Sequence, residues 1–431
     1  MKILHLATQD KAGGGGGFDA AYRLHRSMRS SGLNSYMMVL DKVSNDPDVV
    51  DVGSQLSIYE QLKRLIFKIN GIYLNKIYKS SSYFYFEPKT LISASRLVGM
   101  MPFKPDVIVA HWIAGFVSVV TLRELYNKIG SPIIWYFMDI APMTGGCHYS
   151  LGCMGFTDQC GNCQQLGIGR RKYDLSYRQW KRKWSSFQQM NITALAASSW
   201  VLDQIKICSL FQNKRHEIIL LGVNADIFCP KDPCLARKIH KLPNERKIIF
   251  FGAQHINEKR KGIQYLVDSL SLLHDILATN VSLRERILIV TASRDLNSNQ
   301  FNIPFEHLHI GFLKGDDMLA AAYQAADVFV NASIEDAGPM MINESLLCGT
   351  PVVTFDMGVA EDLVHTGITG YKAILKSSQD MACGLYEILK MDEDSYRSMR
   401  KTCREMGLQK CHPEVQMRAF EKLFHELISD I

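Results

Sequence analysis

The chain has 431 residues, of which 47% are hydrophobic and 21% charged, and its formal net charge is +6. This length exceeds what one core of ordinary size fills, so two domains are expected. The composition excludes extensive disorder. The mild basic excess suits phosphate-bearing ligands or an anionic membrane face, but it does not indicate nucleic acid as a partner.

The first residues, "MKILHLATQDKAGG", do not form a signal peptide, because the apolar stretch is short and polar residues follow it at once. No run of about 18 apolar residues occurs, so no membrane-spanning helix is expected. We therefore expect a cytoplasmic protein, in which the 11 cysteines are thiols or metal ligands rather than disulfides.

The first half of the chain alternates between strand and helix patterns. Lys2–Thr8 is a short apolar run, residues 18–32 have apolar side chains at helical spacing with Gly32 as C-cap, and "NSYMMVL" follows as a second strand. The stretches "DVIVAHW", "PIIWYFMD", "ITALAAS" and "HEIILLGV" continue the series. Such alternation predicts a parallel sheet covered by helices on both faces.

A second series begins after Leu221–Pro233, which has two prolines and no periodicity and is interpreted as a linker. Its strands are "RKIIFFGA", "RILIVTAS", "LHIGFL", "DVFVNAS" and "PVVTFD", with a helix at "GIQYLVDSLSLLHDIL". The fold class is therefore α/β with two doubly wound domains. Ligands of open parallel sheets bind at the carboxyl ends of strands, so the cleft between the domains is the expected site.

Glycine fills every position from Gly13 to Gly17, between the first strand and the first helix. Bare backbone and a helix N-terminus suit an anionic ligand, with Gly16 and Gly17 nearest the helix. A dinucleotide site is an alternative, because Gly15-x-Gly17-x-x-Ala20 fits its loose pattern and Asp41 could bind a ribose. A merely flexible loop is the other alternative.

Arg260, Lys261 and Gly262 precede a helix in the second domain. Cations at a helix N-terminus oppose the helix dipole, which indicates a bound anion such as a diphosphate. A solvated charge cluster is the alternative that the sequence leaves open.

The segment "SIEDAGPMMINESLL" follows a strand and places Asp336 in a loop and Glu344 one turn into a helix that begins near Pro339. Asp336 could accept hydrogen bonds from sugar hydroxyls or cap the helix. Glu344 lies in an apolar helix, where an unpaired carboxylate is costly.

These residues match a known family pattern. "DAGPMMINE" resembles the acid-x7-Glu motif of the family 4 glycosyltransferases, "RKG" resembles their phosphate-binding Lys-Gly, and "LGVNADIFCPKD" and "GTPVVTFDMGVAEDLVHTGITGYKA" resemble two further segments. The resemblance spans nearly the whole chain. It implies the GT-B fold, two Rossmann-like domains facing across a cleft: an acceptor-side domain over residues 1–222, a donor-binding domain over 223–412, and a helix over 413–431 that packs back on the first domain.

The resemblance further implies transfer of a sugar, with retained anomeric configuration, from a UDP- or GDP-sugar to a hydroxyl acceptor without a catalytic metal or other cofactor. Arg260 and Lys261 would then stabilise the leaving diphosphate. Asp336 would position the sugar and Glu344 the ribose. Backbone amides around Gly338, Pro339, Met340 and Met341 would hold the sugar and phosphates.

Two positions depart from that pattern. The strand "PIIWYFMD" ends in Met138 before Asp139, where relatives usually have His, so His111 and His148 are candidates for the missing contact. "FFGAQ" has Ala253 where relatives have Arg, and Arg260 is the candidate substitute. The alternative functions are therefore a nucleotide-sugar epimerase of the same fold and a non-catalytic sugar-nucleotide binding protein.

Four cysteines, Cys147, Cys153, Cys160 and Cys163, are spaced C-x5-C-x6-C-x2-C. Two thiolates on a tight turn with two more nearby suit a closed, structural Zn²⁺ site, which His148 could complete. Disulfides and free thiols are the alternatives. A cysteine-bearing "TGGCHY" segment also occurs in a branch of the family that the chain resembles.

Two segments, Ile58–Ser80 and Ser176–Trp184, combine lysine and arginine with aromatic and aliphatic residues. We expect their apolar faces to pack on the sheet. The alternative is peripheral contact with the anionic inner face of a membrane, which would suit a lipid-linked acceptor in bacterial surface polysaccharide or glycolipid synthesis.

Overall fold

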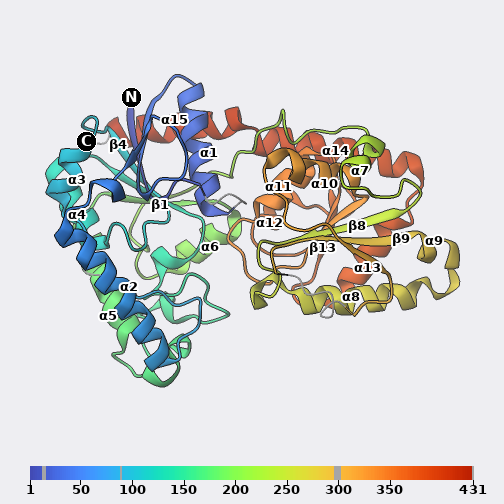
Figure 1. Ribbon diagram of the computed structural model, residues 1–431, viewed down its shortest axis with the longest axis horizontal. Coiled ribbons are helices and arrows are strands. Elements are labelled where there is room, and N and C mark those ends of the chain that lie inside the picture. The colour runs from blue at the N-terminus through green and yellow to red at the C-terminus, as the bar shows by residue number, and fades with distance from the viewer. Residues whose placement is uncertain (12–15, 88–89, 296–301, 430–431) are drawn as a thin grey trace. The chain divides into compact units, whose positions relative to one another are not determined.

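The computed structural model describes residues 1–11, 16–87, 90–295 and 302–429. These residues form two compact units, each built around one parallel sheet (Figure 1). The first unit contains the described residues up to Ile219 and those from Met417 onward, and the second runs from Leu220 to Gln416. The expected domain limits at residues 222 and 412 lie a few residues from these junctions.

The first sheet has seven strands in the order β3-β2-β1-β4-β5-β6-β7. All described pairs in it are parallel. The strands are β1 (Lys2–Gln9), β2 (Asn34–Asp41), β3 (Val49–Asp51), β4 (Val107–Ala110), β5 (Ile133–Phe137), β6 (Ile192–Ala196) and β7 (His216–Ile218).

Seven α-helices are associated with this sheet among the described residues. They are α1 (Gly17–Ser30), α2 (Ile58–Tyr78), α3 (Ala94–Met100), α4 (Val119–Ile129), α5 (Leu175–Phe187), α6 (Ser199–Ile207) and the last helix, α15 (Pro413–Ser429). The last helix returns to the first unit, where the ring of Phe420 packs edge-on against Tyr136 of β5 at 5.6 Å and Glu426 pairs with Arg215.

The second sheet has six parallel strands in the order β10-β9-β8-β11-β12-β13. The strands are β8 (Lys247–Gly252), β9 (Ile287–Ala292), β10 (Glu306–His309), β11 (Val328–Asn331), β12 (Val352–Phe355) and β13 (Gly370–Ala373). The helices are α7 (Pro233–Ile239), α8 (Ile263–Ile276), α9 (Val281–Arg286), α10 (Asp316–Ala325), α11 (Met340–Leu347), α12 (Ala360–Leu363), α13 (Ser378–Leu389) and α14 (Glu393–Cys411).

The expected pair of parallel α/β domains is confirmed. Central strands such as β4 and β5 are buried along their whole length, because helices cover both faces of a parallel sheet. Two edge strands, β3 and β13, were not predicted, since they are short and only partly buried. The strand expected in "LHIGFL" begins earlier, at Glu306, and ends before Gly311, whose φ of 77° interrupts extended backbone.

The expected linker is not a free connection. Val223, Ala225 and Phe228 are buried in the hydrophobic core of the second unit. Within that core, the Val223 amide donates to the Cys411 carbonyl at the end of α14. The proline-rich sequence of this segment therefore reflects irregular backbone inside a domain rather than a flexible spacer.

Candidate active site

Two cations and one carboxylate meet in the second unit. Oδ2 of Asp336 accepts from Nη1 of Arg260 at 2.9 Å and from Nζ of Lys261 at 2.6 Å. Arg260 also lies 2.8 Å from Oε2 of Glu258. Asp336 is only 7% exposed. The structure therefore brings together three residues that the sequence singled out in two separate motifs.

Gly262 explains why this cluster can form. Its φ is +66°, and a Cβ atom there would lie 1.9 Å from the Ala332 carbonyl oxygen. The Ile334 amide donates to the Arg260 carbonyl at 2.7 Å. The loop before α8 is thus held against the chain that leaves β11, which positions both cations beside Asp336.

The charges of the cluster depend on one another. Burial would raise the pKa of Asp336, but Lys261 and Arg260, with hydrogen bonds from Lys261 and the Gly338 amide, hold that pKa below its ordinary value. Burial lowers the pKa of Lys261, and the nearby Arg260 lowers it further against the opposing effect of Asp336. Asp336 is therefore an ionised partner for two cations at neutral pH.

Helix α11 begins beside this cluster. Pro339 occupies its N-cap position without a side-chain cap, so the first helical residues are Met340 and Met341. Glu344 lies one turn further, is 2% exposed, and accepts from the Tyr323 hydroxyl at 3.1 Å. A helix N-terminus and a buried carboxylate thus lie on the same element as predicted.

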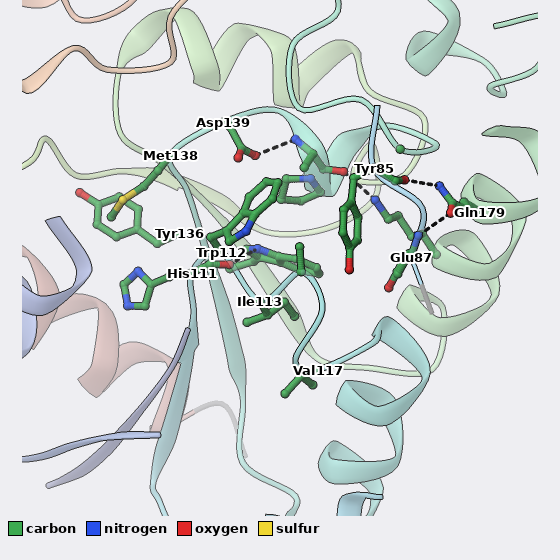
Figure 2. A pocket seen from close by; sticks show the side chains of 16 residues that line it. Tyr85, Glu87, His111, Trp112, Ile113, Val117, Tyr136, Met138, Asp139 and Gln179 are labelled. Carbon is green, nitrogen blue, oxygen red and sulfur yellow. Dashed lines mark hydrogen bonds between the residues drawn. The ribbon is translucent and has the colours of Figure 1, made fainter. Parts of the chain in front are cut away.

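The first unit contains a pocket at the carboxyl ends of two neighbouring strands. It holds about 580 Å³ of open space, and residues after β4 and β5 line it. Figure 2 shows these as Trp112 and Ile113, which follow β4, and Met138 and Asp139, which follow β5. Carboxyl strand ends are the usual ligand position in such sheets.

Aromatic and polar side chains share the pocket lining. The rings of Tyr85 and Trp112 meet at 6.2 Å in an edge-on arrangement. Gln179 accepts from the Glu87 amide at 2.7 Å and donates to the Tyr85 carbonyl at 3.1 Å, which fixes the 85–87 segment (Figure 2). The Glu87 carboxylate accepts from the Val119 amide at the start of α4 at 3.0 Å. The pocket thus offers flat apolar surfaces beside fixed polar groups.

The comparisons with known proteins concern both units. Residues 245–391, which span most of the second unit, match the family described as Glycosyl transferases group 1. The matched residues, 245–391, are called the group 1 domain below. A glycosyltransferase of uncharacterised specificity from Methanocaldococcus jannaschii is 22% identical over 197 residues, 43% of this chain and 48% of that relative. The match thus spans about half the length of that curated relative.

Solved structures resemble the whole chain. Sucrose-phosphate synthase from Thermosynechococcus elongatus has a TM-score of 0.69 at 15% identity and covers 100% of both chains. Anabaena HepE in complex with UDP and glucose has a TM-score of 0.63 at 14% identity and covers 98% of this chain and 99% of that one. The expected GT-B fold is confirmed.

The catalytic candidates fall into both units. Asp336, Glu344, Lys261 and Arg260 lie in the group 1 domain, and His111 lies in the first unit. His111 lines the pocket but is 2% exposed. Its Nε2 atom is 2.9 Å from Nδ1 of His5, and burial lowers its pKa to about 3, with a further contribution from His25. A neutral imidazole at this place can donate or accept one hydrogen bond but carries no charge at neutral pH.

The glycine run is only partly described. Gly13, Gly14 and Gly15 lie outside the described residues. Gly16 has a φ of 97° at the start of α1 and makes no side-chain cap. A Cβ atom on Gly17 would lie 3.5 Å from Cβ of Met138, so α1 begins against the residue that replaces the usual histidine.

The four cysteines Cys147, Cys153, Cys160 and Cys163 are free thiols in the loop between β5 and α5. In the described part of the chain, no group of three or more His, Cys, Asp or Glu side chains is arranged to hold a metal ion. Cys160 accepts from the Gly145 amide at 3.1 Å, and burial raises its pKa to about 12. As placed, the thiols do not form the expected zinc shell.

The polar face of α5 holds this loop. Nζ of Lys183 donates to the carbonyls of Ala141 at 2.6 Å and Thr144 at 2.9 Å, and Gln179 donates to the Gly145 carbonyl at 2.6 Å. Both side chains are buried, whereas Trp184 is 46% exposed. Within Ser176–Trp184 the expectation that the apolar face packs inward is therefore wrong, because the buried Gln179 and Lys183 donate to backbone carbonyls; further along the helix, Phe187 is buried against Trp135 of β5.

Proposed function

We propose that the protein is a retaining glycosyltransferase that moves a sugar from a nucleotide diphosphate to a hydroxyl acceptor. The observation that carries this proposal is the convergence of Arg260 and Lys261 on Asp336 inside the group 1 domain. Two cations held side by side suit the binding of a phosphate-bearing anion.

The donor diphosphate would bind to this pair of cations. In the protein without donor, Asp336 neutralises part of their charge. Charge grows on the diphosphate as the glycosidic bond breaks, and both cations stabilise it there. Amides at the start of α11, around Gly338–Met341, favour the same anion. Asp336 is then available to accept hydrogen bonds from hydroxyls of the sugar, and Glu344 to accept hydrogen bonds from hydroxyls of the ribose.

The pocket of the first unit would bind the acceptor. Trp112 and Tyr85 offer aromatic surfaces against which the apolar C–H face of a sugar ring packs. Glu87 and Asp139 supply carboxylates for hydroxyl groups. Among the described residues, Nδ1 of His111 is buried without a hydrogen-bond partner, which a ligand hydroxyl in the pocket would provide.

The UDP and glucose held by HepE support a UDP-sugar as the first donor to test, with GDP- and ADP-sugars after it. A donor raises the melting temperature of the wild type by binding the native state. The variants Asp336→Ala and Glu344→Ala are expected to lose transfer, and the exposed Asp394→Ala is the matched control. Full transfer activity in either variant would refute the role proposed for that residue. Retention is tested by the anomeric configuration of the product.

A non-catalytic sugar-nucleotide binding protein is the second candidate. Met138 lines the pocket at the position where a histidine is usual in the family that the chain resembles. Binding of a nucleoside diphosphate without turnover of any donor, in the presence of mixed sugar acceptors, would favour this candidate. Donor-dependent product release would eliminate it.

We also propose a structural zinc ion in the cysteine loop, on the spacing of its four cysteines and on their proximity. Its support is that Cys147, Cys160, Cys163 and Cys153 lie close enough for each thiol to affect the pKa of Cys147. Elemental analysis of protein purified without chelators tests it. One equivalent of zinc per chain would support the proposed site, whereas well under one equivalent of zinc, with no iron, would reject it.

A further inference from the structure

Helix α2 carries its apolar side chains on the side that faces away from its unit. Figure 1 shows α2 as a long blue helix along the margin of the first unit. Among its 21 residues only Glu60 is buried. Half-buried residues at helical spacing, including Phe67, Leu74 and Tyr78, form its inner side. This helix is therefore attached along a narrow stripe.

The outer side of α2 is a continuous apolar surface. Its large apolar side chains recur every three or four residues and are between 49% and 87% exposed: Ile58, Leu62, Leu65, Ile66, Ile69, Ile72 and Tyr73. Single exposed apolar residues are common, but a contiguous face over about four turns is unusual and marks an interaction surface. The expectation that this face packs on the sheet is wrong.

Positive charge borders that surface. The helix contains Lys63, Lys68 and Lys76, and Lys79 follows it as the C-cap, whereas its Arg64 pairs with Asp41 at 2.6 Å. Its acid Glu60 is engaged by the Ser57 cap and by Arg96 at 2.9 Å. The charge that remains available to a partner on α2 is therefore positive.

A second segment extends the surface at the end of α2. Gly167 and Gly169 lie close to Tyr78, because a Cβ atom on Gly169 would be 2.1 Å from its ring. Between them Ile168 is 72% exposed, and the exposed residues 170–173, with sequence RRKY, follow. Apolar and cationic side chains thus continue from the helix into this loop.

We propose that α2 and residues 168–173, together the α2 surface, dock on an anionic lipid bilayer. The apolar side chains would enter the boundary between headgroups and acyl chains, and the flanking lysines and arginines would contact anionic headgroups. The helix would lie in the membrane plane, since no helix in the described ranges is both long and apolar enough to cross a bilayer. This inference does not depend on the proposed function.

A second copy of the chain is a less suitable occupant. A second copy would present the same excess of lysines, and like charges at an interface repel. An anionic bilayer instead complements these charges and accepts the apolar side chains at the same time. Charge complementarity therefore selects the membrane.

Vesicle flotation of the full chain tests the proposal. Wild-type protein is expected to float with phosphatidylglycerol-containing vesicles at low salt, less at high salt, and little with pure phosphatidylcholine. The triple variant Leu65→Gln/Ile69→Gln/Ile72→Gln should bind anionic vesicles at least ~10-fold more weakly, since each apolar side chain withdrawn from the membrane weakens binding. The variant Lys68→Gln/Lys76→Gln should lose most of the preference for anionic lipid.

A matched triple variant controls for the general effect of replacing three exposed apolar side chains with glutamine. Leu235→Gln/Ile368→Gln/Ile374→Gln changes side chains of the second unit that are 58%, 52% and 69% exposed, and it should float like the wild type. Wild type that stays with the pellet at low salt, or an α2 triple variant that floats equally well, overturns the proposal. Concentration-dependent dimerisation that the α2 triple variant abolishes, without vesicle binding, would assign the surface to a second copy.

Discussion

Gly262 approaches Ala332 so closely that a Cβ atom at position 262 would lie 1.9 Å from the Ala332 carbonyl oxygen. This contact fixes the loop that carries Arg260 and Lys261 against the end of β11. Two motifs that lie 75 residues apart in the sequence are thereby brought into contact.

The variant Gly262→Ala is expected to displace both cations and abolish the rise in melting temperature that UDP-glucose produces. Positive φ costs a non-glycine residue about 1–2 kcal/mol, and the clash adds to it. Gly311→Ala is the control, because Gly311 has a φ of +77° and nothing lies within 4 Å of its Cβ position. An unchanged UDP-glucose response in Gly262→Ala would contradict this account.

Asp336→Asn should lower the stability of the free protein by about 3 kcal/mol, because two largely buried cations lose their shared carboxylate. UDP should bind this variant at least as tightly as the wild type, since the phosphates no longer compete with Asp336 for the cations. Calorimetric titration with UDP and urea unfolding measure the two effects. Weaker UDP binding at unchanged stability would show that Asp336 contacts the nucleotide instead.

Lys183→Met should release the cysteine loop from α5. Two hydrogen bonds from a charged donor to the carbonyls of Ala141 and Thr144 are lost, at a cost of about 3 kcal/mol. Cys160, which is 9% exposed in the wild type, should then react faster with a thiol reagent. The exposed Lys181→Met is the control. Equal thiol reactivity in the two variants would argue against the anchoring role.

Stability should fall as the pH drops from about 6.5 to about 4. Burial lowers the pKa of His25 from 6.5 to about 4; nearby Asp46 and Asp48 oppose this effect, and Arg29 and Arg26 add to it. The pKa values of His111 and His5 are lowered as well, again first by burial. The unfolded chain therefore binds protons before the folded chain does, and each histidine contributes a slope of up to about 1.4 kcal/mol per pH unit.

Urea unfolding at pH 7, 6 and 5 measures this slope. His25→Asn should reduce the slope of stability against pH by the contribution of one histidine, whereas His425→Asn, at an exposed position, should leave that slope unchanged. Well above pH 6.5 His25 is neutral in both the folded and the unfolded chain, so its replacement should not change the pH dependence there. Identical slopes in the two variants would exclude His25 as a contributor.

Much of the fold could be predicted because buried parallel strands leave an unambiguous sequence pattern. Runs such as "VIVA" and "IIWYF" are apolar at every position, and glycines or polar residues end them. The cation and acid motifs of the group 1 domain were also visible, since each follows a strand at its carboxyl end. Edge strands such as β3 lack the continuous apolar run, and the sequence did not reveal them.

The sequence analysis named His111, Met138 and Asp139, which line the pocket, but the rest of the lining could not be predicted, for a physical reason. Tyr85 and Glu87 come from a loop without a periodic pattern, and Gln179 of α5 fixes them from ninety-odd positions away. Gln179 and Lys183 lie on the inner face of α5 because they donate to backbone carbonyls, and a sequence does not show which carbonyls a side chain will meet. Trp112 follows His111 at the carboxyl end of β4, which is a common place for ligands to bind. This position alone does not distinguish a residue that lines a pocket from one that is buried in the core.

The return of the chain to the first unit has a practical consequence for protein engineering. Phe420 of α15 covers Tyr136, two positions before Met138, although the whole group 1 domain separates these segments in sequence. A chimera that exchanges domains with a relative at a single junction would deprive the first sheet of its own covering helix. Such an exchange needs two junctions, one near Ile219 and one near Met417, so that the tail stays with its native sheet.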